Sequence, residues 1–170
     1  MNMMEKALIA MVLGIFSSSI IAAPSLLNIQ IPLGAVNGAI INNNTVRISK
    51  TLTQSSLINI TRSDNADYFN LLRIKNAKIV KKSASEIQVE INQMLPGGED
   101  AVIFATVGIW INGEHRSLNT VEQGNGVVNI TLRSDLKRIE LRVVGPLIID
   151  LPKNFKGMFN FNIDIDAVEN

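Results

Sequence analysis

The chain has 170 residues, of which 46% are hydrophobic and 18% are charged, and its formal net charge is +1. This material is enough for one core and too little for two ordinary domains, so a single domain is expected. The near-zero charge provides no concentrated positive field, which excludes electrostatic binding to nucleic acid or to an anionic membrane. The chain has no cysteine, so disulfides, thiol catalysis and thiolate metal sites are excluded as well.

Residues 1–23 have the organisation of an export signal. Lys6 supplies a positive charge, Ala7–Phe16 is a continuous apolar run, and Ala22–Ala23 provides small residues suited to cleavage. The apolar run is short for a membrane span. We therefore expect a signal peptide at 1–23 and an exported chain that begins close to its end, with an uncleaved anchor as the alternative.

The stretch that follows predicts an N-terminal β-strand. Its apolar residues fall on one face and Asn28, Gln30 and Pro32 on the other, as expected of a strand with one buried face. The apolar residues are Leu27, Ile29, Ile31 and Leu33. Because Pro32 has no N–H, we expect this strand to lie at an edge, to pair on one side only, or to meet a partner whose hydrogen bonds avoid that position. Gly34–Gly38 then breaks the pattern, so residues 24–38 are expected to form an extension and 39–170 the folded domain.

Short strands separated by turns are predicted along the middle of the chain. They are expected at 39–41, 45–48, 56–61, 72–80 with an interruption at Asn76, 86–91, 101–111, 114–118, 127–132, 139–143 and 147–151. Turns are expected at 42–44, 112–113 and 124–126, where Asn and Gly accept a positive φ, and an exposed loop at 95–100. The apolar run 101–111 predicts a central strand covered on both faces. Pro146 and Pro152 predict an edge strand or a short piece at 147–151.

The last segment, 153–166, is the clearest strand of the sequence. Phe159, Phe161, Ile163 and Ile165 point one way, and Asn and Asp residues alternate with them. With turn signals at a spacing of about 8–12 residues and no helical pattern after the signal, the chain predicts a single all-β sandwich of immunoglobulin-like type. A closed barrel is the alternative.

Few residues have the setting of a catalytic or metal site. The single histidine, His115, is expected on an exposed hairpin arm with no nucleophile or orienting acid in a recognisable motif. Asp164 and Asp166 share a strand face and are interpreted as a solvated face, not as a glycosidase pair. Asp64, Asp67, Glu99 and Asp100 match no calcium loop. We expect no enzyme, no cofactor and no metal.

The two end strands together resemble those of chaperone–usher fimbrial subunits. In that family the chain closes on an alternating strand that begins at a glycine fourteen residues from the end. Gly157 stands at that place here and is followed by Phe159, Phe161, Ile163 and Ile165. The family's penultimate aromatic is absent, because position 169 is Glu.

This resemblance implies an incomplete sandwich that is completed by a donor strand. A periplasmic chaperone would fill the groove beside the terminal strand first, and the N-terminal extension of a neighbouring subunit would fill it after passage through an outer-membrane usher. The donor face would be Leu27, Ile29, Ile31 and Leu33, and the acceptor strand would begin at Gly157. The protein would then be found at the cell surface, as a structural component of a fimbria.

Two other readings remain open from the sequence. The first is that both end strands pair within the same domain. The second is a free-standing exported binding module, such as an adhesin or a carbohydrate-binding sandwich. A sugar-binding platform is disfavoured by the scarcity of aromatic residues and by Trp110, which is expected to be buried by its apolar neighbours.

Overall fold

β-Strands supply the regular secondary structure of the residues that the computed structural model describes, which are 26–39, 46–51, 57–61, 69–133 and 138–169. No helix among them is long and apolar enough to cross a membrane. The expected signal peptide, the turn at 42–44, and Asp64 and Asp67 lie outside the described residues.

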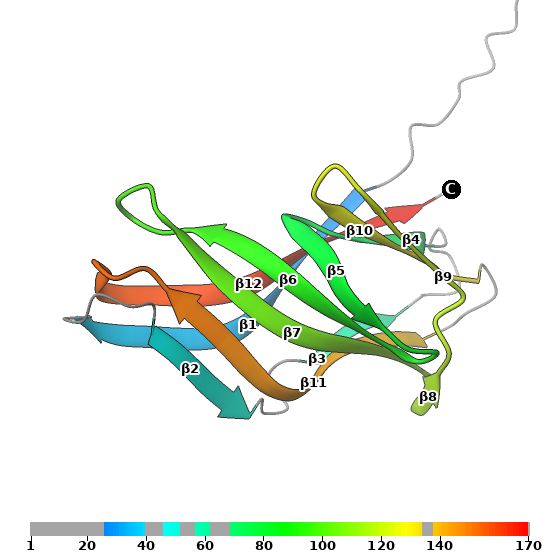
Figure 1. Cartoon of the computed structure of the whole chain (residues 1–170). Coiled ribbons are helices and arrows are strands. Elements are labelled where there is room, and N and C mark those ends of the chain that lie inside the picture. Colours follow the sequence, from blue (N-terminus) through cyan, green and yellow to red (C-terminus); the bar gives the residue numbers. More distant parts are fainter. Residues whose placement is uncertain (1–25, 40–45, 52–56, 62–68, 134–137, 170) are drawn as a thin grey trace, which may run out of the picture.

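Five antiparallel strands form the first sheet, and the two ends of the chain lie side by side in it. Its order is β1 (Leu26–Ala39), β12 (Lys156–Glu169), β4 (Phe69–Ile74), β10 (Val127–Thr131) and β9 (Thr120–Gly124). Figure 1 shows β1 in blue running along β12 in red. β1 is therefore an edge strand of this sheet.

The second sheet is built around β7, as the apolar run 101–111 predicts. Its order is β2 (Val46–Thr51), β11 (Arg138–Leu151), β7 (Asp100–Ile111), β6 (Glu86–Met94) and β5 (Ala77–Lys82). Two short strands join it off this path: β3 (Leu57–Thr61) pairs with β11, and β8 (Glu114–Arg116) pairs with β7. The outer face of β7 is half-buried, whereas the sequence predicts burial on both faces.

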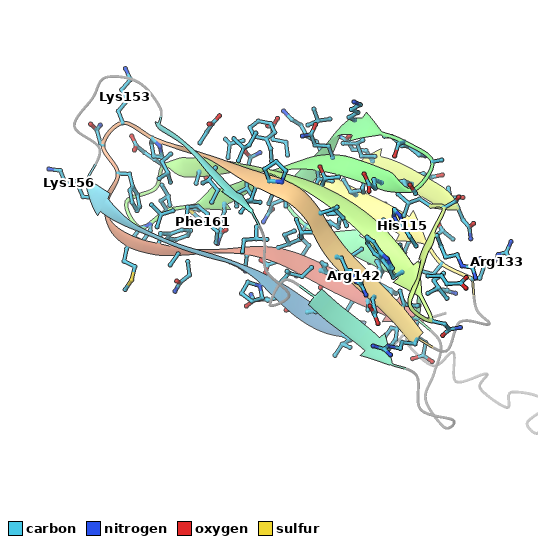
Figure 2. All side chains as sticks on the ribbon, turned by 90° about the horizontal axis from the view of Figure 1, so that it is seen from below. His115, Arg133, Arg142, Lys153, Lys156 and Phe161 are labelled. Atoms are coloured by element: carbon cyan, nitrogen blue, oxygen red, sulfur yellow. The ribbon has the colours of Figure 1, made fainter. Side chains whose placement is uncertain are left out.

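The core lies between the two sheets and is apolar. Ile31, Leu72 and Ile163 of the first sheet and Val89 and Leu141 of the second are each fully buried. Figure 2 shows Phe161 inside the molecule, with Lys153 and Lys156 at one end and Arg133 at the other. Two separate sheets with their own edge strands form a sandwich, so the prediction of an all-β sandwich is confirmed and the barrel alternative is wrong for the described strands.

Two predicted turns have the backbone that their residues favour. Asn112 and Gly113 have φ of 52° and 87°, and Asn125 and Gly126 have φ of 48° and 73°. Positive φ at both central residues is the requirement of a type I′ hairpin turn, which Asn-Gly supplies at little cost. These turns connect β7 to β8 and β9 to β10.

Three predictions about where strands end or how they pair are wrong. Residues 72–80 form two strands in different sheets, because Asn76, with a φ of 50°, lets the chain cross from β4 to β5. The segment 147–151 is the continuation of β11 and pairs on both sides, with β2 and with β7. Pro146 is tolerated because the β7 pairing shifts register between Val144 and Ile148, so the proline lies in an irregular stretch.

The third correction concerns the N-terminal strand. β1 continues through Gly34–Gly38 to Ala39, although the glycines were expected to end it. Gly34 and Gly38 have φ of 124° and 151°, which residues with a side chain rarely adopt, and the pairing to β12 continues past both of them.

Candidate functional site

The candidate site is the seam between β1 and β12, where the sequence-predicted donor and acceptor strands meet. The two strands are antiparallel and pair from Leu26 opposite Val168 to Ala39 opposite Lys156. In this structure the pairing is made within one chain. The seam brings together both sets of residues that the sequence singled out.

The predicted donor residues are buried progressively along β1. Ile31 and Leu33 are 0% and 2% exposed, Ile29 is partly buried, and Leu27 is 45% exposed. Ile29 lies opposite Ile165 and Ile31 opposite Ile163, so apolar residues face the core in pairs. Val36, opposite Phe159, also packs against the core and extends the apolar face beyond the predicted four residues.

The predicted acceptor residues line the other side of the seam. Phe161, Ile163 and Ile165 are buried, and Phe159 is partly buried with its ring edge-on to Phe161 at 5.1 Å between centroids. Gly157 lies at the start of β12, opposite Gly38, with a φ of 103°. Residues with a side chain rarely adopt this φ, which accounts for glycine at this position.

Pro32 marks the free edge of β1. It lies opposite Asn162, whose backbone N–H is directed away from β1, since it donates to Gln93 at 3.2 Å. In an antiparallel pair this arrangement is a non-hydrogen-bonded pair, so the N–H that proline lacks would have pointed to the open edge. The register shifts by one residue between Pro32 and Gly34. Pro32 thus leaves the seam intact and discourages a further strand from adding outside β1.

A polar cluster fixes the N-terminal part of the seam from the outer face. The Asn28 side-chain amide donates to Asp166 at 3.0 Å, and Lys75 of the β4–β5 turn forms an ion pair with the same carboxylate at 3.0 Å. Burial alone would raise the pKa of Asp166. The hydrogen bonds from Lys75 and Asn28 and the positive charges of Lys75 and Arg73 outweigh that effect, so the pKa lies below its ordinary value.

Gln93 is a contact of the seam that the sequence analysis missed. Its side chain reaches from β6 of the second sheet to the backbone of β12 at Asn160 and Asn162. It occupies the inward-facing position that continues Ile87, Val89 and Ile91. The sequence did contain a signal, because Gln93 is a polar residue at a position where the period of two places apolar residues. An inward-facing amide of this kind needs hydrogen-bond partners inside the fold.

His115 is on an exposed hairpin arm, as predicted, and contacts no described catalytic partner. Its ring stacks on Trp110 with centroids 4.2 Å apart, and Nε2 lies 3.3 Å from the Ser85 carbonyl oxygen. Trp110 is only partly buried, against expectation, because it lies on the outer face of β7 between His115 of β8 and Arg142 of β11. No group of three potential metal-binding side chains is found in the described part of the chain.

The comparisons with known proteins identify one fimbrial relative and one family model. The chain is 27% identical over 134 residues to the K88 minor fimbrial subunit FaeF of Escherichia coli, which covers 79% of this chain and 80% of the relative. This similarity confirms the expected resemblance to fimbrial subunits. No solved structure gives a significant match. Residues 7–167 match a family of unknown function, DUF5462, and the chain therefore belongs to that family.

Proposed function

We propose that this protein is an exported structural subunit of a bacterial surface fimbria, and that β1 is a donor strand that completes the sandwich of a neighbouring subunit. The observation that carries this proposal is the pairing of β1 with β12 along the edge of the five-stranded sheet. The fimbrial relative supports a structural and non-enzymatic role.

The physical basis is that β1 is separable from the rest of the sandwich. It pairs only with β12 among the described strands, whereas β12 also pairs with β4. Without β1, the apolar residues Phe161, Ile163 and Ile165 would lie beside an open edge with unpaired backbone groups. Such an edge binds an extended strand through backbone hydrogen bonds, and the pockets for alternate side chains set the register.

The proposed route follows from that need for a strand. A periplasmic chaperone would supply a temporary strand to the open edge, and an outer-membrane usher would be the place where a neighbouring subunit replaces it. The face of Leu27, Ile29, Ile31 and Leu33 is the proposed donor face. The subunit would then be found in the fimbria at the cell surface.

A free-standing exported module or adhesin is the second candidate. It is favoured by the fact that β1 pairs with β12 of the same chain here. The two candidates differ in which chain contributes β1 in the assembled protein. Pairing within one chain predicts a stable monomer, and donation predicts that β1 leaves its own domain during assembly.

An introduced disulfide distinguishes them, since the chain has no cysteine of its own. Gln30 lies opposite Asp164, whose carbonyl oxygen accepts from the backbone N–H of Lys75 in the β4–β5 turn at 2.9 Å and so points away from β1. The two residues therefore form a non-hydrogen-bonded pair. Cα atoms in such a pair are about 4.5 Å apart, within the range that a disulfide spans. We expect the double variant Gln30→Cys with Asp164→Cys to form an intrachain disulfide only while β1 occupies its own groove.

The measurement is the thiol state of the chain in sheared fimbriae and in the periplasm, by mass spectrometry without reduction. Donation predicts that fimbrial chains lack the intrachain disulfide and that chains which contain it remain periplasmic monomers. Fimbriae built from chains with the intrachain disulfide would overturn the donor role. The matched control combines Gln30→Cys with Asn160→Cys, because Asn160 lies opposite Ala35 and is out of reach.

A further inference from the structure

The acceptor strand β12 has a neighbouring strand on its second side along only part of its length. β4 pairs with it from Ile165 to Glu169, and the last backbone contact is the N–H of Lys75 to the carbonyl of Asp164. Along 157–163, the described strands include a partner for β12 on the β1 side alone. This half of β12 includes Phe159 and Ile163, which lie opposite Val36 and Ile31 of β1, and the buried Phe161, which lies opposite Gly34.

The Gln93 side chain occupies the place of the missing strand. Its Nε2 donates to the Asn160 carbonyl at 3.2 Å and to Oδ1 of Asn162 at 2.7 Å, and its Oε1 accepts from the Asn162 backbone N–H at 3.2 Å. A donor and an acceptor on one side chain thus satisfy a backbone carbonyl and a backbone N–H of β12. This is the pattern by which a neighbouring strand binds.

The position of Gln93 makes this contact specific. It is the last inward-facing residue of β6, at the point where the seven-stranded sheet crosses β12. Pro32 lies on the opposite side of Asn162, so this residue has the donor strand on one side and Gln93 on the other. Loss of the Gln93 amide would leave the Asn162 N–H and the Asn160 carbonyl without these partners.

We propose that Gln93 is a positioning residue of the acceptor strand: it holds 160–162 extended for the donor and denies this edge to any second strand. The inference deepens the proposed function, because it concerns the groove that the donor fills. The Gln93 contact joins β6 of the second sheet to the acceptor strand β12 and does not include β1. It can therefore be tested in the monomer whether or not β1 is exchanged.

Gln123 provides a matched control elsewhere in the molecule. Its Oε1 accepts the backbone N–H of Ile79 at 2.9 Å, so it too is a glutamine that binds a strand backbone through its side chain. Ile79 lies on β5, at the far edge of the other sheet from the seam. Gln93→Ala and Gln123→Ala therefore each remove a side-chain acceptor for a strand N–H, at two different places in the molecule.

The test is amide hydrogen exchange of the full mature chain, resolved by residue. We expect Gln93→Ala to speed exchange at Asn162 by about tenfold, as loss of hydrogen bonds of ordinary net strength gives. Exchange at Ile29 and Ile31 of β1 should rise with it, while β7 stays protected. Gln123→Ala should speed exchange at Ile79 and leave Asn162 unchanged.

Three results would overturn the proposal. They are unchanged exchange at Asn162 in Gln93→Ala, a uniform rise that includes β7, or a rise at Asn162 that leaves β1 unaffected. Gln93→Glu is the second variant, because it keeps the acceptor for the Asn162 N–H and loses the donor to the Asn160 carbonyl. It should protect the Asn162 amide better than Gln93→Ala does, and equal exchange in the two variants would contradict the proposed contact. Fimbriae that contain the intrachain disulfide would defeat the donor role and leave these exchange results standing.

Discussion

Asp166 is the residue through which charge acts on the seam. Its carboxylate accepts a hydrogen bond from the Asn28 side chain of β1 and forms an ion pair with Lys75 of the β4–β5 turn. These interactions hold its pKa below the ordinary value of 3.8. A carboxyl group with a depressed pKa in the folded state adds stability above its ordinary pKa. That stability is lost as the pH falls through the depressed value.

We expect acid to loosen the N-terminal part of the seam first. From about pH 5 to about pH 2, amide exchange at Leu27 and Ile29, corrected for the intrinsic effect of pH, should rise as Asp166 takes up a proton. Asp166→Asn should remove most of this dependence. If the variant kept the full pH dependence, another group would be responsible for it.

Glu140 is the one described residue that is both charged and buried, at 2% exposure, and it organises the outer face of the second sheet. Its two carboxylate oxygens bind Arg138 at 2.6 Å and Arg142 at 2.5 Å, and the Arg142 guanidinium lies 4.6 Å from the centre of the Trp110 ring. The buried carboxylate thus places a cation against the ring of the chain's single tryptophan.

Glu140→Gln is expected to destabilise the fold by about 1–3 kcal/mol, because a buried site loses two charge-assisted bonds and the two arginines lose the charge between them. Urea unfolding followed by Trp110 fluorescence measures the change. Glu114→Gln is the control, since Glu114 pairs with Arg116 at an exposed position and should change stability by no more than about 0.5 kcal/mol. Equal effects of the two variants would contradict the role of Glu140.

At the scale of elements, the sequence predicts strands well where one face is buried. The alternation at 86–91 and 157–165 appears directly in β6 and β12, because a period of two is the geometry of a half-buried strand. The Asn-Gly signals gave correct hairpins for the same reason, since few residues accept positive φ.

The same signals are ambiguous where the chain changes sheet or bends. Asn76 takes the chain from one sheet to the other, and Gly145–Pro146 only distorts a continuous strand, yet both interrupt an apolar pattern in the sequence. Sheet membership is decided by long-range packing, which a local pattern does not contain. For this reason β4 and β5 were predicted as one strand and β11 as two.

At the scale of the whole molecule, the sequence identified both strands of the seam but not how the seam is held. The apolar residues of β1 and β12 alternate with polar ones, so each strand could be predicted from its own stretch of sequence. The contacts of Gln93 with Asn162 and of Asn28 with Asp166 join residues far apart in the chain, and no spacing rule predicts them. The pairing of the two ends also decides the stability of the whole sandwich, because β1 covers an edge of its core.

Deletion of residues 26–39 tests that dependence. Burial of Ile31 and Leu33 contributes about 1.5–3 kcal/mol each, a large share of the roughly 5–15 kcal/mol that stabilises a domain. We expect the shortened chain to aggregate or to lose its cooperative thermal transition. A synthetic peptide of residues 26–39 added in trans should restore the transition, because the open edge of β12 then regains its partner.

Two altered peptides test whether recovery of the thermal transition depends on the apolar side chains that β1 packs into the core. Ile31→Asp places a carboxylate at a fully buried position and should abolish rescue, since an unpaired buried charge costs several kcal/mol. Ala35→Asp places the same carboxylate on an exposed position of the same strand, opposite the uncharged Asn160, and should still rescue. A shortened chain with an unchanged transition would show that β1 is dispensable for the fold. Equal rescue by both peptides would show that apolar pockets do not select the strand that fills the edge.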